Sequence, residues 1–112
     1  MMKSPLTPDA AELIAGRFQA LSDPTRLRII DFLRHHEEAS VGEITEALGS
    51  SQQNASKHLG ILLQAGIVAR RKEGTSSFYS VADEGVFELW EQVCGGLQTQ
   101  LAELTALVEA TA

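Results

Sequence analysis

Apolar residues recur at helical spacing over the first third of the chain, in two stretches that each begin with a helix-starting pair. The pairs are Thr7-Pro8 and Asp23-Pro24, in which a capping residue precedes a proline at the first helical position. The spacing that follows each pair predicts one helix from Thr7-Pro8 onward and a second helix over residues 24–35.

Two shorter helices come next, and a tight turn separates them. The residues SVGE at 40–43 form a capping box, which opens a helix that ends at Gly49. Either Ser50 or Ser51 then caps a helix over 51–64. Two short helices joined by a Gly-Ser-Ser turn predict a helix-turn-helix.

The periodicity changes after the fourth helix. Residues 67–71 and 78–81 are rich in β-branched and aromatic side chains and enclose a turn with Gly74, which predicts a β-hairpin. From Asp83 onward the spacing is helical again. The order ααααββα predicts a mainly helical α+β fold that forms a single domain over residues 1–112.

The last helix carries a long apolar stripe. Its members recur at spacings of three and four, as in a heptad repeat: Val86, Trp90, Val93, Leu97, Leu101, Leu104 and Val108. So small a body has too little surface to cover this stripe, which predicts a homodimer. Gly95-Gly96 either allows two helices to approach closely or bends or breaks the helix. The neighbouring Cys94 either bridges two copies or is a buried free thiol.

Composition narrows the class of protein. The chain has 112 residues, of which 44% are hydrophobic, and this fits one globular domain. A single cysteine excludes an internal disulfide and a multi-cysteine zinc site. There is no apolar run near the roughly 20 residues of a membrane span, and no apolar core of a signal peptide. We therefore expect a soluble cytoplasmic protein with no membrane partner.

The charge is unevenly distributed. The net charge is -6 for the whole chain, but it is -3 over residues 1–50, +3 over 51–77 and -6 over 78–112. Binding to a phosphate backbone requires a local basic patch and not a basic whole. The middle segment, which contains the fourth helix and the hairpin, could supply that patch.

Uncharged hydrogen-bonding residues gather at the start of the fourth helix. The candidate DNA contacts there are Ser51, Gln52, Gln53, Asn54, Ser56, Lys57 and His58. The first turns of a recognition helix reach base edges in the major groove, where Gln and Asn bond adenine and Lys serves guanine or phosphate. The alternative is a solvated polar face on a well-capped helix.

The hairpin adds cations to this surface. Arg70, Arg71 and Lys72 approach the turn on one strand, and Thr75 lies in the turn itself. A ribbon with cations and small hydroxyls at its tip suits phosphate or minor-groove contact. The alternative is an edge strand whose charges prevent aggregation.

Three segments together resemble the ArsR/SmtB family of winged-helix repressors. They are LSDPTRLRIIDFL at 21–33, SVGEITEALGSSQQNASKHLGILLQAGIVARRKEGTSSFYSVAD at 40–83, and the long final helix, so the resemblance covers nearly the whole chain. It implies a winged helix-turn-helix repressor with recognition helices in successive major grooves and an effector that weakens DNA binding. It also implies a homodimer joined by the first and last helices. Such a dimer would bind an inverted repeat in double-stranded DNA. The corresponding interface residues are Leu13, Phe18, Val86, Trp90, Val93, Leu97, Leu101 and Leu104.

The sensing sites of that family do not carry over. The segment SVGEITEAL lacks the cysteine pair that the family uses before the recognition helix, so thiolate sensing of arsenite, cadmium or lead is not expected there. Of the family's ligands on the last helix, only Asp83 matches. A lone Cys94 also excludes paired-cysteine redox sensing.

A candidate nickel or zinc site remains at the end of the second helix. Its ligands would be His35, His36 and Glu37, because imidazole nitrogen and carboxylate oxygen suit both metals. The alternative is a solvated turn whose histidines complement the helix C-terminal dipole.

The leading interpretation is thus a dimeric DNA-binding transcriptional regulator with a possible Ni²⁺ or Zn²⁺ effector. A second is a winged helix controlled by a small molecule or by a protein co-regulator, or one that serves only as a protein-interaction module through its acidic last helix. An enzyme is not expected, because the sequence has no nucleophile–base pair, glycine-rich phosphate loop or intact metal triad.

Overall fold

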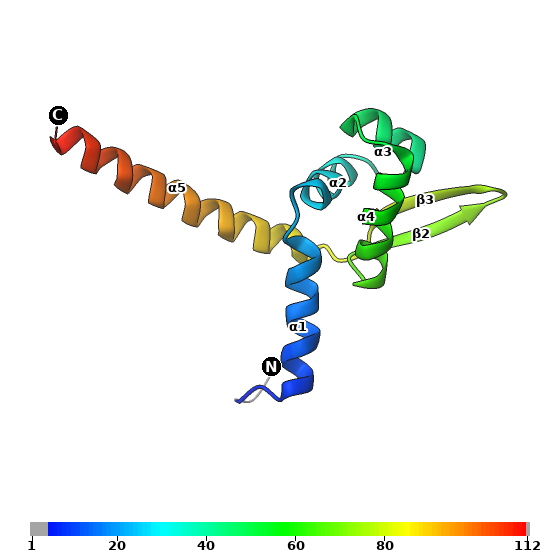
Figure 1. The fold of residues 1–112 in the computed structure, drawn as a ribbon, viewed down its shortest axis with the longest axis horizontal. Coiled ribbons are helices and arrows are strands. Elements are labelled where there is room, and N and C mark those ends of the chain that lie inside the picture. Colours follow the sequence, from blue (N-terminus) through cyan, green and yellow to red (C-terminus); the bar gives the residue numbers. More distant parts are fainter. Residues whose placement is uncertain (1–4, 112) are drawn as a thin grey trace. The chain divides into compact units, whose positions relative to one another are not determined.

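The computed structural model describes residues 5–111, which form five helices and three strands (Figure 1). The elements are α1 (Pro8–Leu21), α2 (Pro24–Arg34), β1 (Ala39–Ser40), α3 (Val41–Leu48), α4 (Gln52–Gln64), β2 (Val68–Glu73), β3 (Ser76–Val81) and α5 (Gly85–Thr111). The chain divides into a body that ends at Ala82 and a C-terminal unit that begins at Asp83. The helix-turn-helix is α3–α4, and the hairpin is β2–β3.

The first four helices begin where the sequence predicts. Their caps are Thr7, Asp23, Ser40 and Ser51, and each cap side chain accepts a hydrogen bond from a backbone N–H in the first turn. Ser40 and Glu43 form the reciprocal capping box, with the Ser40 N–H donating to Glu43 Oε1 at 2.9 Å. The left-handed Gly49, with φ 68°, ends α3 and permits the sharp turn into α4.

The three strands form one antiparallel sheet in the order β1-β3-β2. Sequence analysis did not identify β1, which is two residues long and pairs with Phe78 and Tyr79 of β3. The hairpin strands also extend further than predicted, to Glu73 and Ser76. This leaves a tight two-residue turn in which Gly74 takes the positive φ of 62°.

The core of the body lies where α2, α3, α4 and the sheet meet. Its fully buried large side chains are Ile29, Ile30, Leu33, Ile44, Leu59, Leu62 and Ile67. Of the residues in α1, only Ala20 is buried. Burial of one side of α4 against this core leaves its polar side at the surface.

The C-terminal unit is the single long helix α5. It runs through Gly95-Gly96 without a break, so the glycine pair does not end it. Its exposed large apolar residues include Val93, Leu97, Leu101, Leu104, Leu107 and Val108. Cys94 is exposed in the single chain, so burial of its thiol would require a second copy. Across residues 5–111 there is no helix long and apolar enough to span a membrane.

Candidate nucleic-acid interface

Helix α4 separates an apolar side from a polar side, as predicted. Ala55, Leu59 and Leu62 are buried, whereas Gln52, Gln53, Ser56 and Lys57 are exposed. The helical repeat places Gln53, Ser56 and Lys57 together on the side opposite the buried residues. These three side chains can therefore reach a ligand without moving the helix.

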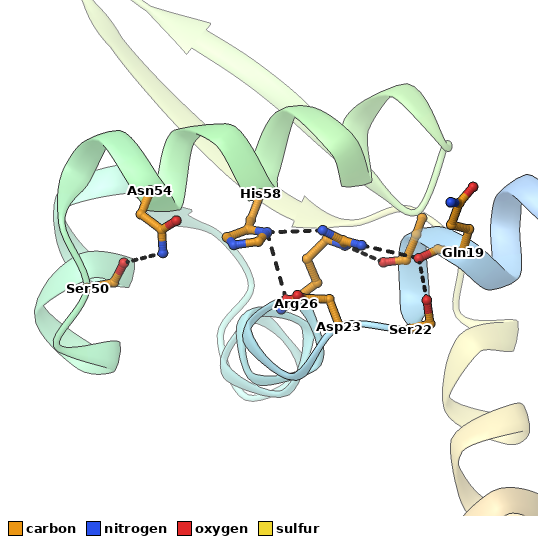
Figure 2. A network of polar contacts seen from close by, with 8 residues as sticks. Gln19, Ser22, Asp23, Arg26, Ser50, Asn54 and His58 are labelled. Atoms are coloured by element: carbon orange, nitrogen blue, oxygen red, sulfur yellow. Dashed lines mark hydrogen bonds and ion pairs between the residues drawn. The ribbon is translucent and has the colours of Figure 1, made fainter.

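Two of the predicted contacts are also engaged within the helix-turn-helix. Ser51 accepts a hydrogen bond from the Asn54 N–H at 3.1 Å, which caps α4. The Asn54 side chain donates to Ser50 Oγ at 3.2 Å (Figure 2). Both residues remain exposed, but these hydrogen bonds give them a role in fixing the turn between α3 and α4.

His58 does not lie on the polar side of α4. Its side chain is only 12% exposed and lies 3.8 Å from Asp23 Oδ2. Its Nδ1 atom is 3.1 Å from Arg26 Nη1, and the two side chains face each other in Figure 2. The prediction that His58 contacts DNA is therefore not supported, because the helical repeat turns this side chain toward α2.

The hairpin places its three cations on two different faces. Successive side chains of a strand point to opposite sides of the sheet, so Arg70 and Lys72 share one face and Arg71 lies on the other. In the register, Arg70 is opposite the buried Tyr79, and Arg71 is opposite Phe78. Arg70, Lys72 and Thr75 are exposed.

Arg71 is occupied by the protein itself. Its guanidinium donates to both carboxylate oxygens of Glu38 at 2.9 Å and to Glu73 Oε2 at 2.7 Å. It also lies over the ring of Phe78, with 4.9 Å between Cζ and the ring centroid. The hydrogen bonds from Arg71 lower the pKa of Glu38, and those to Glu38 and Glu73 raise the pKa of Arg71. A DNA contact by Arg71 stays a prediction and would require its half-exposed guanidinium to leave these carboxylates.

Three cations of α4 and the hairpin are left for a polyanion. Lys57, Arg70 and Lys72 are exposed, and within residues 5–111 none of them forms an ion pair. Together with the polar residues of α4, they make up what we call the recognition surface: Gln52, Gln53, Ser56, Lys57, Arg70 and Lys72. This surface combines groups that read base edges with groups that bind phosphate.

The predicted metal ligands do not come together. His35 is the C-cap of α2 and lies 3.7 Å from Asp31 Oδ1. His36 points elsewhere, because its Nδ1 donates to the Phe32 carbonyl at 2.8 Å and its ring stacks on Phe32. Over the part of the chain that is described, no group of three or more His, Cys, Asp or Glu residues could hold a metal ion. The arrangement matches the alternative of a solvated turn at the end of α2.

Asp83, which matches a metal ligand of the family, has a local structural role at the start of the last helix. Asp83 Oδ1 accepts a hydrogen bond from the Gly85 N–H at 3.0 Å, at the start of α5. The carboxylate thus supports the first turn of that helix.

Most predicted interface residues are exposed on the single chain. Leu13 and Phe18 of α1 are 78% and 55% exposed, and Val93, Leu97, Leu101 and Leu104 of α5 are all more than half exposed. Trp90 is half-buried, and Val86 is buried already within one chain. Val86 therefore offers little surface to a partner.

Sequence reasoning missed the role of Arg26. Arg26 lies in the segment 21–33 that carries the family resemblance, but local pattern gives no sign that this arginine reaches a residue 32 positions away on α4. The same side chain contacts the end of α1 (Figure 2). Only the packing of α1, α2 and α4 brings these groups together.

Known proteins resemble this chain over most of its length. A family model described as a helix-turn-helix domain matches residues 21–71. An uncharacterized HTH-type transcriptional regulator of Methanocaldococcus jannaschii is 44% identical over 78 residues, which cover 70% of this chain and 88% of that one. A transcriptional repressor SmtB homolog of Synechocystis is 36% identical over 90 residues, covering 80% and 67%. A probable mercury resistance operon repressor of Streptomyces lividans is 42% identical over 72 residues, covering 64% and 57%.

Solved structures of regulators of this type also resemble this chain. A crystal structure of a Mycobacterium tuberculosis protein has a TM-score of 0.74 at 33% identity and covers 88% of this chain and 97% of its own. A solution structure from Mycobacterium bovis has a TM-score of 0.72 at 32% identity and covers 89% and 94%. It is described as a homodimeric winged helix-turn-helix DNA-binding domain of a possible ArsR-family regulator.

Proposed function

Because this chain belongs to the ArsR/SmtB family of winged helix-turn-helix transcriptional regulators, we propose that it acts as a homodimeric repressor that binds a specific DNA sequence through its recognition surface. The observation that carries this proposal is the set of exposed polar side chains on α4 together with two exposed cations of the hairpin.

The chemistry of the recognition surface assigns different tasks to its members. Gln53, near the start of α4, can donate and accept at one adenine, so it provides base selection. Lys57 can bond guanine or phosphate. Arg70 and Lys72 neutralise phosphates, which fixes the position of the protein on the duplex but carries no sequence information. Affinity and specificity should therefore be separable by mutation.

A homodimer follows from the apolar surface of α1 and α5. Monomeric soluble proteins rarely expose large contiguous apolar patches, yet both helices expose several large aliphatic or aromatic residues. A two-fold dimer of helix-turn-helix units binds an inverted repeat with half-sites about one helical turn apart. We infer that the operator of this protein is such an inverted repeat. We also infer that residues 1–112 form one DNA-binding domain with dimerisation helices at both ends.

Fluorescence anisotropy on the chain's own promoter DNA tests the proposal. The wild-type protein should bind this DNA more tightly than a scrambled duplex at one fixed salt concentration. Gln53→Ala should reduce the ratio of the two affinities, whereas Lys72→Ala should weaken binding to both duplexes about equally. Equal wild-type affinity for promoter and scrambled DNA would contradict the proposal.

A metal effector is the second element to test, because one relative is named as a mercury resistance repressor. Within residues 5–111 of a single chain the side chains do not form a metal site, so any such site would draw on groups beyond these. Titration of the protein–DNA complex with Ni²⁺ and Zn²⁺ decides the matter, with His35→Ala/His36→Ala as the control. A tenfold shift corresponds to about 1.4 kcal/mol of coupling. With no shift, a small molecule or a protein co-regulator becomes the candidate effector.

A further inference from the structure

The side chain of Arg26 joins three helices of the body (Figure 2). Arg26 belongs to α2, and its Nε donates to the Ala20 carbonyl at 2.6 Å while its Nη2 donates to the Gln19 carbonyl at 3.2 Å. Both carbonyls lie in the last turn of α1, where the regular helical hydrogen bonds end. The Gln19 carbonyl also accepts from the N–H and the Oγ of Ser22. The remaining Nη1 faces His58 of α4 at 3.1 Å. One guanidinium therefore connects the end of α1 to the middle of the recognition helix.

The Arg26–His58 contact fixes the chemical form of the histidine. Arginine has only donors, so His58 Nδ1 must accept this hydrogen bond, and the neutral ring carries its proton on Nε2. Asp23 Oδ2, which lies 3.8 Å from His58 Nδ1, accepts a hydrogen bond from the Arg26 backbone N–H at 3.0 Å. This hydrogen bond is the main reason that the pKa of Asp23 is lowered. Loss of the imidazole acceptor would leave part of the guanidinium without its partner.

Helix α1 also holds the other end of α4. Arg17 of α1 donates from Nε and Nη2 to the Ala65 carbonyl at 3.3 and 3.1 Å. Its Nη2 also lies 3.4 Å from the Gly66 carbonyl. Helix α4 is thus attached to α1 at its C-terminal end and, through Arg26, near its middle.

These polar attachments fix the rotational orientation of α4, which apolar packing alone does not fix. Ala55, Leu59 and Leu62 determine how deeply α4 is buried, but aliphatic contacts have little directional preference. A hydrogen bond is directional, so the contact at His58 limits rotation of α4 about its own axis. Lys57 precedes His58 directly, and Gln53 lies little more than one helical turn away. Small rotations of α4 would therefore move the side chains that face the bases.

We propose that His58 and Arg26 are positioning residues that set the orientation of α4 relative to α1, and hence the base specificity of the protein. The inference rests on the proposed function, since it concerns how DNA is read. It assigns no DNA contact to either residue. Because α1 is also an expected dimerisation helix, the same link would make base specificity depend on how the two copies are joined.

Two substitutions of His58 distinguish a positioning role from a direct contact with DNA. His58→Gln keeps an acceptor that can reach Arg26, whereas His58→Phe keeps a ring of similar size but has no acceptor. For His58→Phe we expect the ratio of promoter to scrambled affinity to fall about tenfold, as for loss of a hydrogen bond to a charged group. Affinity for scrambled DNA should stay unchanged, and His58→Gln should restore most of the ratio. Circular dichroism and thermal unfolding check that each variant is folded.

A double-mutant cycle tests the pairing itself. Arg26→Lys keeps the charge but replaces the branched donor group by a single nitrogen. If the two residues act together, Arg26→Lys/His58→Phe should lose no more specificity than the worse of the single variants. In the wild-type protein, the long-range nitrogen–proton spectrum of the imidazole should show Nδ1 without a proton.

The outcomes distinguish this inference from the proposed function. If the wild-type protein shows no preference for promoter DNA, the proposed function fails. If the preference exists but His58→Phe retains it, or His58→Gln loses as much as His58→Phe, the positioning role is overturned. A parallel loss of affinity for both duplexes in His58→Phe would instead indicate direct phosphate contact and also overturn it.

Discussion

At the scale of single residues, Arg70 and Arg71 show how adjacent arginines can have different tasks. Arg70 is exposed without an ion pair, as far as residues 5–111 are concerned. Arg71 donates to two carboxylates and lies over an aromatic ring. The alternation of side chains along β2 produces this difference. Arg71 connects the hairpin to the residue before β1, whereas Arg70 remains for a ligand.

The two arginines should therefore differ in their effect on DNA binding. Arg70→Ala should weaken binding to promoter and scrambled DNA alike and reduce the slope of log affinity against log salt by about one. Arg71→Ala should leave that slope nearly unchanged, because its guanidinium is already paired. Anisotropy titrations at several salt concentrations measure both slopes. Equal slopes in the two variants would show that Arg71 leaves Glu38 to bind phosphate.

Three carboxylates make the stability of the fold sensitive to acid. Hydrogen bonds from Arg26, Arg71 and Ser40, respectively, lower the pKa values of Asp23, Glu38 and Glu43. Each folded pKa is lower than the unfolded value of about 4. The stability that these groups contribute is therefore fully present above that value and is lost as pH falls through the folded pKa.

Urea unfolding between pH 7 and pH 3 measures this dependence. The free energy of unfolding should stay nearly level down to about pH 5 and fall below about pH 4. Glu38→Gln should make the fall less steep, because one of the three carboxylates is then missing. Glu12→Gln, on the exposed face of α1, is the matched control and should follow the wild-type curve. A Glu38→Gln curve as steep as the wild type would contradict the assignment.

At the scale of elements, the two glycines of the α4 segment have opposite effects on the stability of the fold. Gly60 lies within the helix, and a Cβ at this position would meet nothing within 4 Å. Gly66 follows the helix with φ 76°, and a Cβ there would lie 3.0 Å from Arg17 Nη2. The first glycine only weakens the helix, whereas the second allows the chain to turn toward β2.

The same substitution should therefore change stability in opposite directions at these positions. Gly60→Ala should stabilise the protein by about 1 kcal/mol, the difference in helix propensity. Gly66→Ala should destabilise it by about 1–2 kcal/mol, since alanine disfavours the left-handed conformation. Urea unfolding of both variants at neutral pH provides the comparison. A destabilising Gly60→Ala would mean that the outer side of α4 is more crowded than the described contacts indicate.

At the scale of the whole molecule, the family places this chain among transcriptional regulators, and the prediction that it is not an enzyme is confirmed. The large apolar residues of α5 from Val93 to Val108 are each more than half exposed. Exposure of this extent is typical of a surface that a second protein copy covers.

Charges on the apolar stripe of α5 should dissociate the dimer. In Leu97→Glu/Leu101→Glu, burial of two carboxylates at the interface is unfavourable. Analytical ultracentrifugation should then show a monomer, and promoter affinity should fall about 100-fold because the two half-sites are no longer bound together. The matched control is Ala102→Glu/Ala106→Glu, which adds the same charges on the opposite side of the helix. An undiminished dimer in the first variant would place the interface elsewhere.

The sequence by itself determined the elements and the kind of surface they carry. Helix caps, apolar periodicity and turn glycines act over about one helical turn, so they located the first four helices and the hairpin correctly. Segmental charge located the basic region of an acidic chain. Tertiary structure decided which polar residues remain free. Arg71 meets Glu38 at a separation of 33 residues, and Arg26 meets His58 at 32. Such contacts depend on packing between elements, and the same is true of β1, which pairs with β3.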